Sequence, residues 1–376
     1  MRIGVNARRL EGQPLGVARY IEYLLGYWAE MLHDDERCVL YVREHLGHDR
    51  VPAGPFDTVV LRPKLRGFMW ENVRLPTATR RDDVFFGPSY SLPLAHRGPS
   101  VVMIHSVNEV QEGTHEWWYP YTFTNVYRAS ARKADRVIVP SQSVKDDIQG
   151  AYGIAADKID IVPQGADDDF RPVDDEDVLR RTRVEQLGED RPYVVFVGKL
   201  SQRRNIPVLI EAFAEVLRRR PDLPHKLLLF GPNHLDLPLA EVSRDLGIED
   251  RVVQTDGRLE HHHDLTRIYS AADAYISASA YEGFSITVVE AMACGAPVIG
   301  IDRAAFGEIV GDAGHLVDEP TVEKLAGALE RVLPDEAYRR ELSAKGLERA
   351  RAFRWEDNAR RTLEILREVA NGARGS

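Results

Sequence analysis

The sequence predicts an α/β protein built from two doubly wound domains, each with a parallel sheet covered by helices on both faces. Short apolar runs alternate with longer amphipathic runs from the first residues, and this alternation stops near the middle of the chain and then restarts. Apolar runs without polar alternation are typical of parallel strands that are buried on both faces. Because such sheets bind ligands outside the carboxyl ends of their strands, we expect a site in a cleft that the two domains face.

The first half of the chain contains seven candidate strands, with helical patterns at 17–32 and 141–152 between them. The strands are expected at 2–6, 38–42, 58–61, 83–87, 100–105, 136–141 and 160–163. The restarted pattern adds helices at 205–220 and 264–273, and it ends in a helical pattern that closes the chain. Its strands are expected at 193–198, 226–231, 251–255, 274–279, 297–301 and 315–318.

Residues 166–192 interrupt the pattern, because this segment is acidic, poor in apolar residues and punctuated by proline. We interpret it as the connection between domains, with one short helix, and the alternative is a solvated loop inside one domain. The predicted organisation is an N-terminal domain at 1–170, a connection at 171–192, a C-terminal domain at 193–352 and a final helix at 353–376 that returns to the first domain.

Composition excludes several classes of function. A net charge of −10 argues against a nucleic-acid partner, because nucleic-acid binding depends on clustered Lys and Arg. The only cysteines, Cys38 and Cys294, match no metal or redox spacing. The first residues contain no apolar run of signal-peptide length, and no stretch is apolar enough to span a membrane. We therefore expect a cytoplasmic protein.

The stretch "YEGFSITVVEAMACGAPVIG" (281–300) holds two acids, Glu282 and Glu290, in otherwise apolar surroundings. On one helix they would stand about 12 Å apart along the axis. Paired glycosidase carboxylates stand roughly 5 to 9.5 Å apart, so a shared hydrolytic role is not expected. Glu282 instead falls in the loop after the strand at 274–279, and Glu290 falls within a short apolar helix.

A glutamate on a buried helix needs hydrogen-bond partners, and the vicinal hydroxyls of a ribose suit it. The free backbone amides at the start of the helix would face an anion such as a diphosphate. These amides belong to Gly283, Phe284, Ser285 and Ile286. The alternative is that Glu290 pairs with a core arginine and Glu282 is a solvated loop residue.

Cations occur at the same predicted edge of the sheet. In "VGKLSQRRNIPVLIEAF", Lys199 follows a strand, and Arg203 and Arg204 precede the next helix. Such cations can stabilise the charge that develops on a leaving diphosphate. Each alone is more often a surface charge, and their coincidence with the amide-rich loop favours a site.

The sequence resembles the glycosyltransferases of family 4, which are retaining nucleotide-sugar transferases with two Rossmann-like domains in the B-type fold. The resemblance covers nearly the whole chain. "YSAADAYISASAYEGFSITVVEAMACGAPVIG" is similar to the family's paired-glutamate signature, and "GKLSQRRNIPVLIEAF" is similar to its "GRLxxxKGxxxLIEAF". "IVPQGADDDFRP" resembles "VPNGVDxxxFRP", and "FRWEDNARRTLEIL" resembles the closing helix that crosses back to the first domain.

This resemblance implies roles for individual residues. Glu290 would hold the ribose hydroxyls, Glu282 would lie beside the donor sugar, and Phe284 and Ser285 would offer amides. Lys199 and Arg204 would contact the diphosphate, at positions where the family has arginine and lysine. The remaining donor contacts implied are Gly198 at the strand end, with Arg258 and Leu259 of "DGRL" against the base.

Besides Lys199 and Arg204, the chain departs from the family pattern at three further positions of this region. Asn205 replaces a usual glycine, and Ser285 and Thr287 replace a commonly seen glycine and proline. These departures bear on the contacts to the donor sugar.

For the first domain, the resemblance places His105 at the floor of the cleft near the donor sugar, with Ser106 where an aspartate is common. Gly16 matches one glycine of the family's acceptor-binding loop. The aromatic run at 115–123 and the basic, aromatic segment at 64–76 could contact an acceptor or a membrane surface. Burial in a core is the interpretation we favour for both, and peripheral membrane contact is kept as a hypothesis.

Two runs could suggest metal chemistry. The "HHHD" run (261–264) places adjacent histidines that cannot all face one ion, and "DDD" (167–169) lies in the acidic connection. We therefore expect neither a catalytic metal nor a cofactor.

The predicted function is transfer of a hexose-type sugar, with retention, from a nucleoside diphosphate sugar, UDP- or GDP-linked, to a hydroxyl of a glycan, lipid-linked or small-molecule acceptor. A nucleotide-sugar epimerase of the same fold and a hinged two-domain sugar-binding protein are the alternatives. A dinucleotide oxidoreductase is disfavoured, because no GxGxxG follows the first strand. The sequence does not identify the sugar, the base, the acceptor or the oligomeric state.

Overall fold

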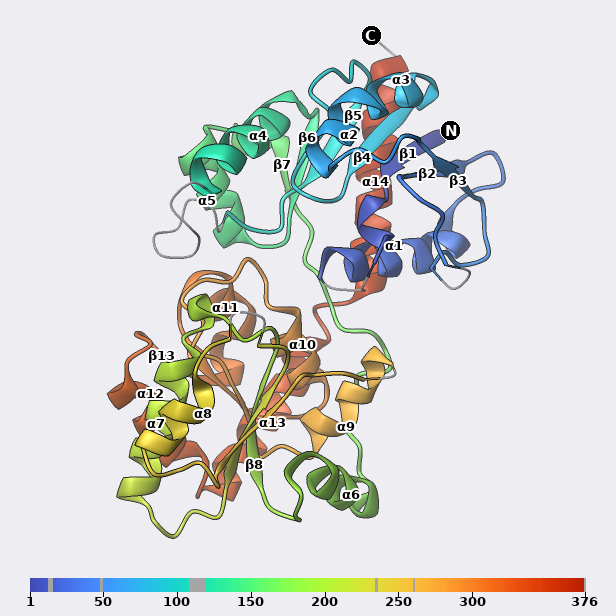
Figure 1. Ribbon diagram of the computed structural model, residues 1–376. Coiled ribbons are helices and arrows are strands. Elements are labelled where there is room, and N and C mark those ends of the chain that lie inside the picture. The colour runs from blue at the N-terminus through green and yellow to red at the C-terminus, as the bar shows by residue number, and fades with distance from the viewer. Residues whose placement is uncertain (13–15, 48–49, 108–118, 234–235, 260, 375–376) are drawn as a thin grey trace. The chain divides into compact units, whose positions relative to one another are not determined.

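The computed structural model describes residues 1–12, 16–47, 50–107, 119–233, 236–259 and 261–374. The chain divides into two compact units. The first combines Met1–Gln164 with Trp355–Ser376, and the second is Gly165–Arg354 (Figure 1).

The first unit is built on a seven-stranded sheet in the order β3-β2-β1-β4-β5-β6-β7, and every pair of neighbours is parallel. The order reverses between β1 and β4, as in doubly wound dinucleotide folds. The predicted strands are confirmed, with ends displaced by a few residues. They are β1 (Arg2–Asn6), β2 (Arg37–Val42), β3 (Phe56–Val60), β4 (Val84–Gly87), β5 (Ser100–Met103), β6 (Arg136–Val139) and β7 (Ile159–Ile161).

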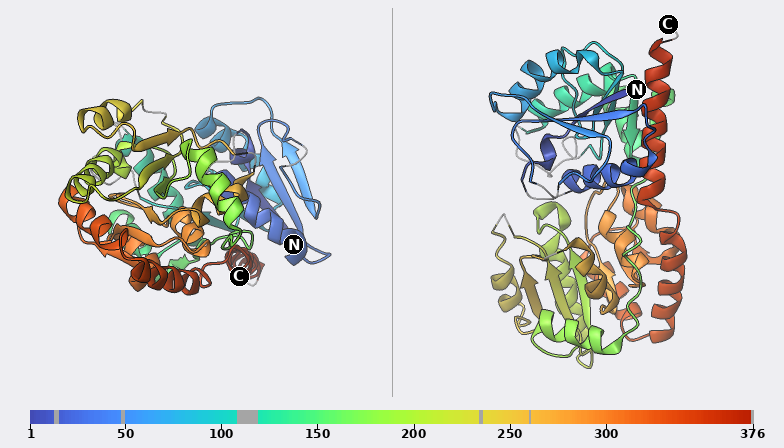
Figure 2. Two further views of the ribbon diagram at one scale, coloured as in Figure 1. Left: turned by 90° about the horizontal axis from the view of Figure 1, so that it is seen from below. Right: turned by 90° about the vertical axis from the view of Figure 1, so that its right-hand side faces the viewer.

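Helices cover this sheet. They are α1 (Val17–Met31), α2 (Gly67–Val73), α3 (Leu75–Ala78), α4 (Tyr119–Lys133), α5 (Gln142–Tyr152) and α14 (Trp355–Arg374). The last of these packs beside α1 and on β4, β5 and β6, and Figure 2 shows it lying along the first unit. The Trp28 indole donates to the Ala359 carbonyl at 2.9 Å, and Trp355 stacks on Tyr23 with centroids 4.6 Å apart. The prediction that the closing helix returns to the first domain is confirmed.

The second unit has a six-stranded parallel sheet in the order β10-β9-β8-β11-β12-β13, so the order reverses between β8 and β11. The strands are β8 (Tyr193–Val197), β9 (Lys226–Phe230), β10 (Val252–Thr255), β11 (Ala274–Ile276), β12 (Val298–Ile301) and β13 (Gly314–Val317). The helices are α6 (Glu176–Leu187), α7 (Ile206–Arg219), α8 (Leu239–Asp245), α9 (Leu265–Ser270), α10 (Ile286–Ala293), α11 (Ala304–Val310), α12 (Val322–Val332) and α13 (Glu336–Ala350).

Alternate residues of β8 enter two separate apolar clusters, one on each face of this sheet. Val194 and Phe196 pack with α7 and α12, whereas Tyr193, Val195 and Val197 pack with α9 and α10. A strand that is buried on both faces shows no polar alternation, which explains the continuous apolar run in the sequence.

The unit boundaries differ from those expected from composition. The chain passes from one unit to the other after Gln164 and again before Trp355, whereas the sequence suggested 170 and 353. The acidic segment 171–192 is part of the second unit and contains α6, a helix capped by the Asp175 side chain. Because α6 buries only a narrow apolar edge, including Leu187, its composition resembles that of a linker.

No helix among the described residues is long and apolar enough to cross a membrane.

Candidate functional site

Four charged side chains gather where the strand order of the second sheet reverses. Lys199 lies just beyond β8, and Arg203 and Arg204 end a short 3-10 helix before α7. Glu282 lies beyond β11, the strand that pairs with β8. Such a reversal is where doubly wound sheets bind ligands at the carboxyl ends of their strands. The structure therefore brings these sequence-predicted residues together.

Glu282 pairs with both arginines. Its Oε2 lies 3.4 Å from Arg203 Nη1, and its Oε1 lies 3.5 Å from Arg204 Nε. Burial alone would raise the pKa of Glu282, but the two guanidinium charges and a hydrogen bond from Ser279 outweigh burial and hold the pKa below its ordinary value. Glu282 is therefore an anion at neutral pH that orients both arginines.

Gly198 allows Arg204 to lie against the strand end. Gly198 has φ of 139°, and a Cβ there would stand 1.8 Å from Arg204 Nη1. The guanidinium lies 5.7 Å from the centroid of the Phe196 ring, and its Nη1 lies 3.4 Å from the Lys199 carbonyl oxygen. A side chain at position 198 would push Arg204 out of this place.

Lys199 differs from the arginines because its side chain is exposed. Within the part of the chain that the structure describes, its ammonium group has no ion pair or hydrogen bond. Three cations therefore stand against one carboxylate at this edge of the sheet, and the surplus positive charge favours an anionic ligand.

The turn before α10 presents backbone amides. Ser285 is the N-cap residue with φ of 78°, and its side chain makes no capping hydrogen bond. Among the described residues, the amides of Phe284, Ser285 and Ile286 donate to no protein acceptor. Gly283 and Phe284 are buried, and the Phe284 ring packs edge-on against Phe353. Free amides at the positive end of a helix dipole can bind an anion.

Glu290 is 1% exposed on α10 and accepts hydrogen bonds from two side chains that the sequence analysis missed. The Tyr269 hydroxyl donates to Oε2 at 3.2 Å, and His262 Nε2 lies 2.6 Å from Oε1. Burial raises the pKa of Tyr269 well above its ordinary value, so its hydroxyl is a permanent donor. The alternative of a core arginine as the partner of Glu290 is not what the structure shows.

His262 belongs to the "HHHD" run (261–264), which stood out in the sequence as a histidine cluster. Among the described residues, no group of three or more His, Cys, Asp or Glu side chains could hold a metal ion. The rings of His261 and His263 stack on each other with centroids 5.2 Å apart, whereas the ring between them meets Glu290. The backbone separates the three rings, because His261 is extended at the N-cap position and His262 begins the short 3-10 helix His262–Asp264.

The predicted base-contacting residues lie beside the same strand end. A Cβ on Gly257 would stand 2.7 Å from Gly231 Cα, and a Cβ on Gly231 would stand 2.0 Å from the Gly198 carbonyl oxygen. These close approaches bring the "DGRL" segment next to Gly198. Arg258 is exposed and pairs with Asp256 at 2.7 Å, and Leu259 packs against the apolar cluster on the α10 face of the sheet.

In the first unit, His105 follows β5, is partly buried, and has hydrogen-bond partners at both ring nitrogens. Its Nε2 donates to the Pro88 carbonyl at 2.9 Å, and its Nδ1 accepts from Gln164 Nε2 at 2.9 Å. Tyr20 and Tyr90 pack edge-on against the ring, with centroids 4.9 and 5.3 Å away. Burial lowers the pKa of His105 to about 4, so the imidazole is neutral at physiological pH.

Two other predicted features of the first unit are Gly16 and the aromatic run at 115–123. Gly16 is the N-cap of α1 with φ of 43°, and a Cβ there would meet nothing within 4 Å, so it borders open space. Of the aromatic run at 115–123, residues 115–118 lie outside the described residues, and the side chains of 119–123 do too.

Comparison with known proteins decides the family. Residues 15–170 match the sequence model described as "Glycosyltransferase Family 4", and residues 180–349 match "Glycosyl transferases group 1". The chain belongs to glycosyltransferase family 4. This family 4 protein is 30% identical over 291 residues to a D-inositol 3-phosphate glycosyltransferase of Rhodococcus erythropolis, a match that covers 75% of this chain and 64% of that protein. It is 25% identical over 291 residues to O-antigen chain mannosyltransferase B of Escherichia coli, covering 76% and 74% of the two chains.

Solved structures share the fold. Sucrose-phosphate synthase from Thermosynechococcus elongatus has a TM-score of 0.78 and 22% identity, with 99% of this chain and 100% of that chain covered. The Anabaena protein HepE, in complex with UDP and glucose, has a TM-score of 0.78 and 18% identity, with 98% and 100% covered. This family 4 chain therefore has the B-type glycosyltransferase fold, with two parallel-sheet α/β domains.

Proposed function

We propose that the chain transfers a hexose, with retention of anomeric configuration and without a metal, from a nucleoside diphosphate sugar to a hydroxyl acceptor. The observation that carries the proposal is the grouping at the β8 and β11 ends of Lys199, Arg204 and the carboxylate of Glu282. Beside them lie the backbone amides of Phe284, Ser285 and Ile286, which are unpaired among the described residues. Cations and free amides suit a diphosphate, and the buried carboxylate of Glu290 suits ribose hydroxyls.

The donor is a UDP- or GDP-linked hexose in this proposal. The Anabaena protein of the same fold was solved with UDP-glucose, and one relative is named a mannosyltransferase. The acceptor is a hydroxyl of a glycan, a lipid-linked saccharide or a small molecule, since the relatives' names include an O-antigen chain and an inositol phosphate.

Glu282 does not act as a general base in this proposal, because both of its carboxylate oxygens are paired with arginines. In the proposed step, the bond between the anomeric carbon and the diphosphate oxygen breaks, and the acceptor oxygen attacks from the same face. The acceptor proton passes to the departing diphosphate oxygen. Lys199, Arg204 and the amides of Ser285 and Ile286 stabilise the charge that develops on the diphosphate.

Ligand-induced thermal stabilisation tests donor binding. UDP, GDP, ADP, dTDP and CDP sugars are added in turn, and one of them is expected to raise the melting temperature by mass action. Slow hydrolysis of that donor, followed by NMR, reports the configuration of the released sugar. Release of the inverted anomer would exclude retention, and no stabilisation by any of the nucleotides would overturn the proposal.

Variants at the strand end give the second test. Lys199→Ala and Arg204→Ala should each lower turnover roughly a hundredfold, because each removes stabilisation of charge in the transition state. Glu249→Gln, an exposed change elsewhere in the second unit, serves as a control. Wild-type turnover in both cationic variants would defeat the mechanism.

The two alternatives separate in the same assays. An epimerase would release free nucleotide without any acceptor and would leave an epimerised sugar, whereas a transferase needs an acceptor for rapid release. A hinged sugar-binding protein would bind a free sugar and show no affinity for nucleotides.

Peripheral membrane contact is part of the proposal, and helix α2 supports it. Phe68, Met69 and Val73 on this helix are 52%, 55% and 55% exposed. Arg66 is exposed at the start of α2, and Lys64 is exposed just before it. An apolar face with flanking cations suits an anionic lipid surface.

Flotation tests this contact. The protein should float with phosphatidylglycerol-containing vesicles at low salt, and the double change Phe68→Ser and Met69→Ser should keep it in the soluble fraction. If the wild-type protein stays in the soluble fraction at low salt, the proposed membrane contact is wrong.

A further inference from the structure

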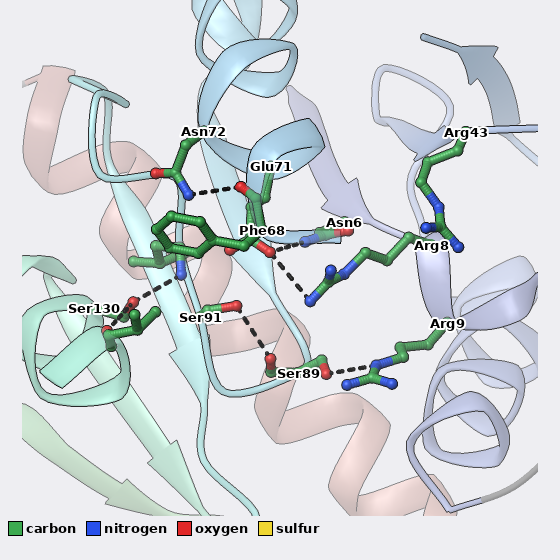
Figure 3. A network of polar contacts seen from close by, with 12 residues as sticks. Asn6, Arg8, Arg9, Arg43, Phe68, Glu71, Asn72, Ser89, Ser91 and Ser130 are labelled. Carbon is green, nitrogen blue, oxygen red and sulfur yellow. Dashed lines mark hydrogen bonds and ion pairs between the residues drawn. The ribbon is translucent and has the colours of Figure 1, made fainter. Parts of the chain in front are cut away.

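Three arginines of the first unit lie at the carboxyl ends of neighbouring strands. Arg8 and Arg9 are the first residues of a short 3-10 helix, Arg8–Leu10, which follows β1. Arg43 directly follows β2. Figure 3 shows the three side chains on the same side of the strand ends, with Arg8 between the other two. We call Arg8, Arg9 and Arg43 the arginine cluster.

Two members of the arginine cluster, Arg8 and Arg9, stand where the strand order of the first sheet reverses between β1 and β4, and Arg43 stands at the end of the adjacent strand β2. Arg9 Nε donates to the hydroxyl of Ser89 at 3.1 Å, and Ser89 lies just beyond β4 (Figure 3). This hydrogen bond therefore joins the two strand ends that flank the reversal. Reversals of this kind are where doubly wound sheets hold their ligands.

Two buried carboxylates hold the inner arginines. Arg8 Nη2 lies 3.2 Å from Oε2 of Glu71, whose side chain is 2% exposed, and Arg43 Nε lies 2.7 Å from Oε2 of Glu11, whose side chain is 1% exposed. Burial lowers the pKa of Arg8, and the neighbouring charges of Arg9 and Arg43 act in the same direction. The cluster thus concentrates positive charge where burial and repulsion between the guanidinium groups make that charge unfavourable.

Arg9 carries the unbalanced charge. Three guanidinium groups stand against two carboxylates, and Arg9, the exposed member, contacts a neutral hydroxyl. Within the described residues its Nη1 and Nη2 have no protein partner, and its charge also contributes to the low pKa of His105. Among the described residues, Arg9 therefore offers two unpaired guanidinium nitrogens to a ligand.

Buried polar atoms without partners also mark this place. In the described part of the chain, Arg8 Nε, Glu71 Oε1 and Asn6 Oδ1 are buried and have no hydrogen-bond partner. Such orphaned atoms are uncommon in a finished core and are more frequent at sites that bind a ligand or ordered water.

We propose that Arg9, backed by Arg8 and Arg43, binds an anionic group of the acceptor, a phosphate ester that also carries the reacting hydroxyl. The planar fork of arginine matches a phosphate in two-point contact. This inference rests on the proposed function, since it assigns the acceptor of the same reaction. The phosphate can belong to a soluble phosphomonoester or to a lipid headgroup.

The test uses the full chain with its donor site saturated by the nucleoside diphosphate that stabilises it most, so that phosphate cannot bind there. Glycerol 3-phosphate is titrated and binding is measured by calorimetry, with glycerol as the neutral probe. Arg9→Gln should weaken binding of glycerol 3-phosphate roughly tenfold, which is the usual effect of losing one charged hydrogen bond. Arg9 is the variant of choice because its removal strands no buried carboxylate.

Arg37→Gln is the matched control, an exposed arginine at the amino end of β2, on the opposite edge of the sheet. It should bind glycerol 3-phosphate as wild type does, and both variants should melt at the wild-type temperature. A second arm measures flotation with phosphatidylcholine vesicles with and without phosphatidic acid. Dependence on Arg9 in either arm supports the proposal and identifies the source of the phosphate.

The inference is overturned if Arg9→Gln equals wild type in both arms, or if glycerol binds as tightly as glycerol 3-phosphate. The affinity of each variant for the nucleoside diphosphate is measured separately. If no nucleotide binds wild type, the proposed function itself fails; if nucleotide binds and phosphate does not, the acceptor assignment alone fails.

Discussion

His262 Nε2 lies 2.6 Å from Oε1 of Glu290, and both residues belong to the second unit. The hydroxyl of Tyr269 donates a hydrogen bond to the other carboxylate oxygen of Glu290, Oε2. A carboxylate oxygen can accept more than one hydrogen bond, so a ribose hydroxyl can bind Glu290 while His262 stays in place. The histidine therefore orients the group proposed to grip the ribose.

Removing His262 should weaken nucleotide binding specifically through the ribose. His262→Ala is expected to lower the affinity for the best nucleoside diphosphate roughly tenfold, because a charged hydrogen bond that orients Glu290 is lost. The preference for this nucleotide over its 2′-deoxy analogue should shrink at the same time. Calorimetric titration of both nucleotides measures this ratio, which a general loss of stability would not change.

His263→Ala is the matched control, because His263 is the exposed neighbour in the same run. It should leave both affinities unchanged. An unaltered preference between the two nucleotides in His262→Ala would show that His262 does not position Glu290.

Lowering the pH should remove the stability that Glu282 contributes. Its folded pKa lies below the ordinary value of 4.5, so the contribution is complete above that pH and declines as pH falls through the lower folded pKa. Glu282→Gln should therefore be less stable than wild type near neutral pH, by about 1 kcal/mol, and the difference should disappear in acid. Urea unfolding across this range measures it, and a difference that is independent of pH would contradict the charge assignment.

The sequence predicted both sheets, because a strand that is buried on both faces appears in the sequence as an unbroken apolar run. It also placed Lys199, Arg204 and Glu282 at one edge, since the carboxyl ends of parallel strands meet there. What composition could not show was that the segment containing α6 belongs to the second unit, because the charged surface of this helix resembles a linker.

Side-chain partners were the other part that the sequence could not supply. His262 and Tyr269 lie in a different helix-rich segment from Glu290, and only the packing of α9 on α10 brings them together. Arg9 and Ser89 are 80 positions apart and meet through the pairing of β1 with β4. Such contacts depend on topology rather than on local pattern.

His105 should destabilise the fold in mild acid. Its folded pKa is about 4 against an ordinary 6.5, so the unfolded chain binds the proton more readily, and stability falls as pH drops from 6.5 towards 4. His105→Gln should lose less stability over this interval, by a difference on the order of 2 kcal/mol. Urea unfolding at several pH values measures it, with the exposed His45→Gln as control. Parallel curves for wild type and His105→Gln would show that the pKa of His105 is not lowered in the folded chain.

Ser285 occupies a backbone conformation that favours glycine. Its φ is 78° at the start of α10, in the left-handed region that costs roughly 1–2 kcal/mol for a residue with a side chain. Asn205 has φ of 50° at the start of α7 and donates from Nδ2 to the Ala278 carbonyl at 2.9 Å. Asparagine tolerates this conformation better than serine does, so the strain is concentrated at Ser285.

Ser285→Gly should therefore keep or raise the melting temperature while leaving nucleotide affinity unchanged, because the amide that faces the ligand is retained. Ser285→Val should lower stability by about 1–2 kcal/mol, since a β-branched side chain suits positive φ least. Thermal melts with and without the nucleoside diphosphate measure both effects. If Ser285→Gly bound nucleotide much more weakly than wild type, the hydroxyl rather than the amide would be the group that contacts the donor.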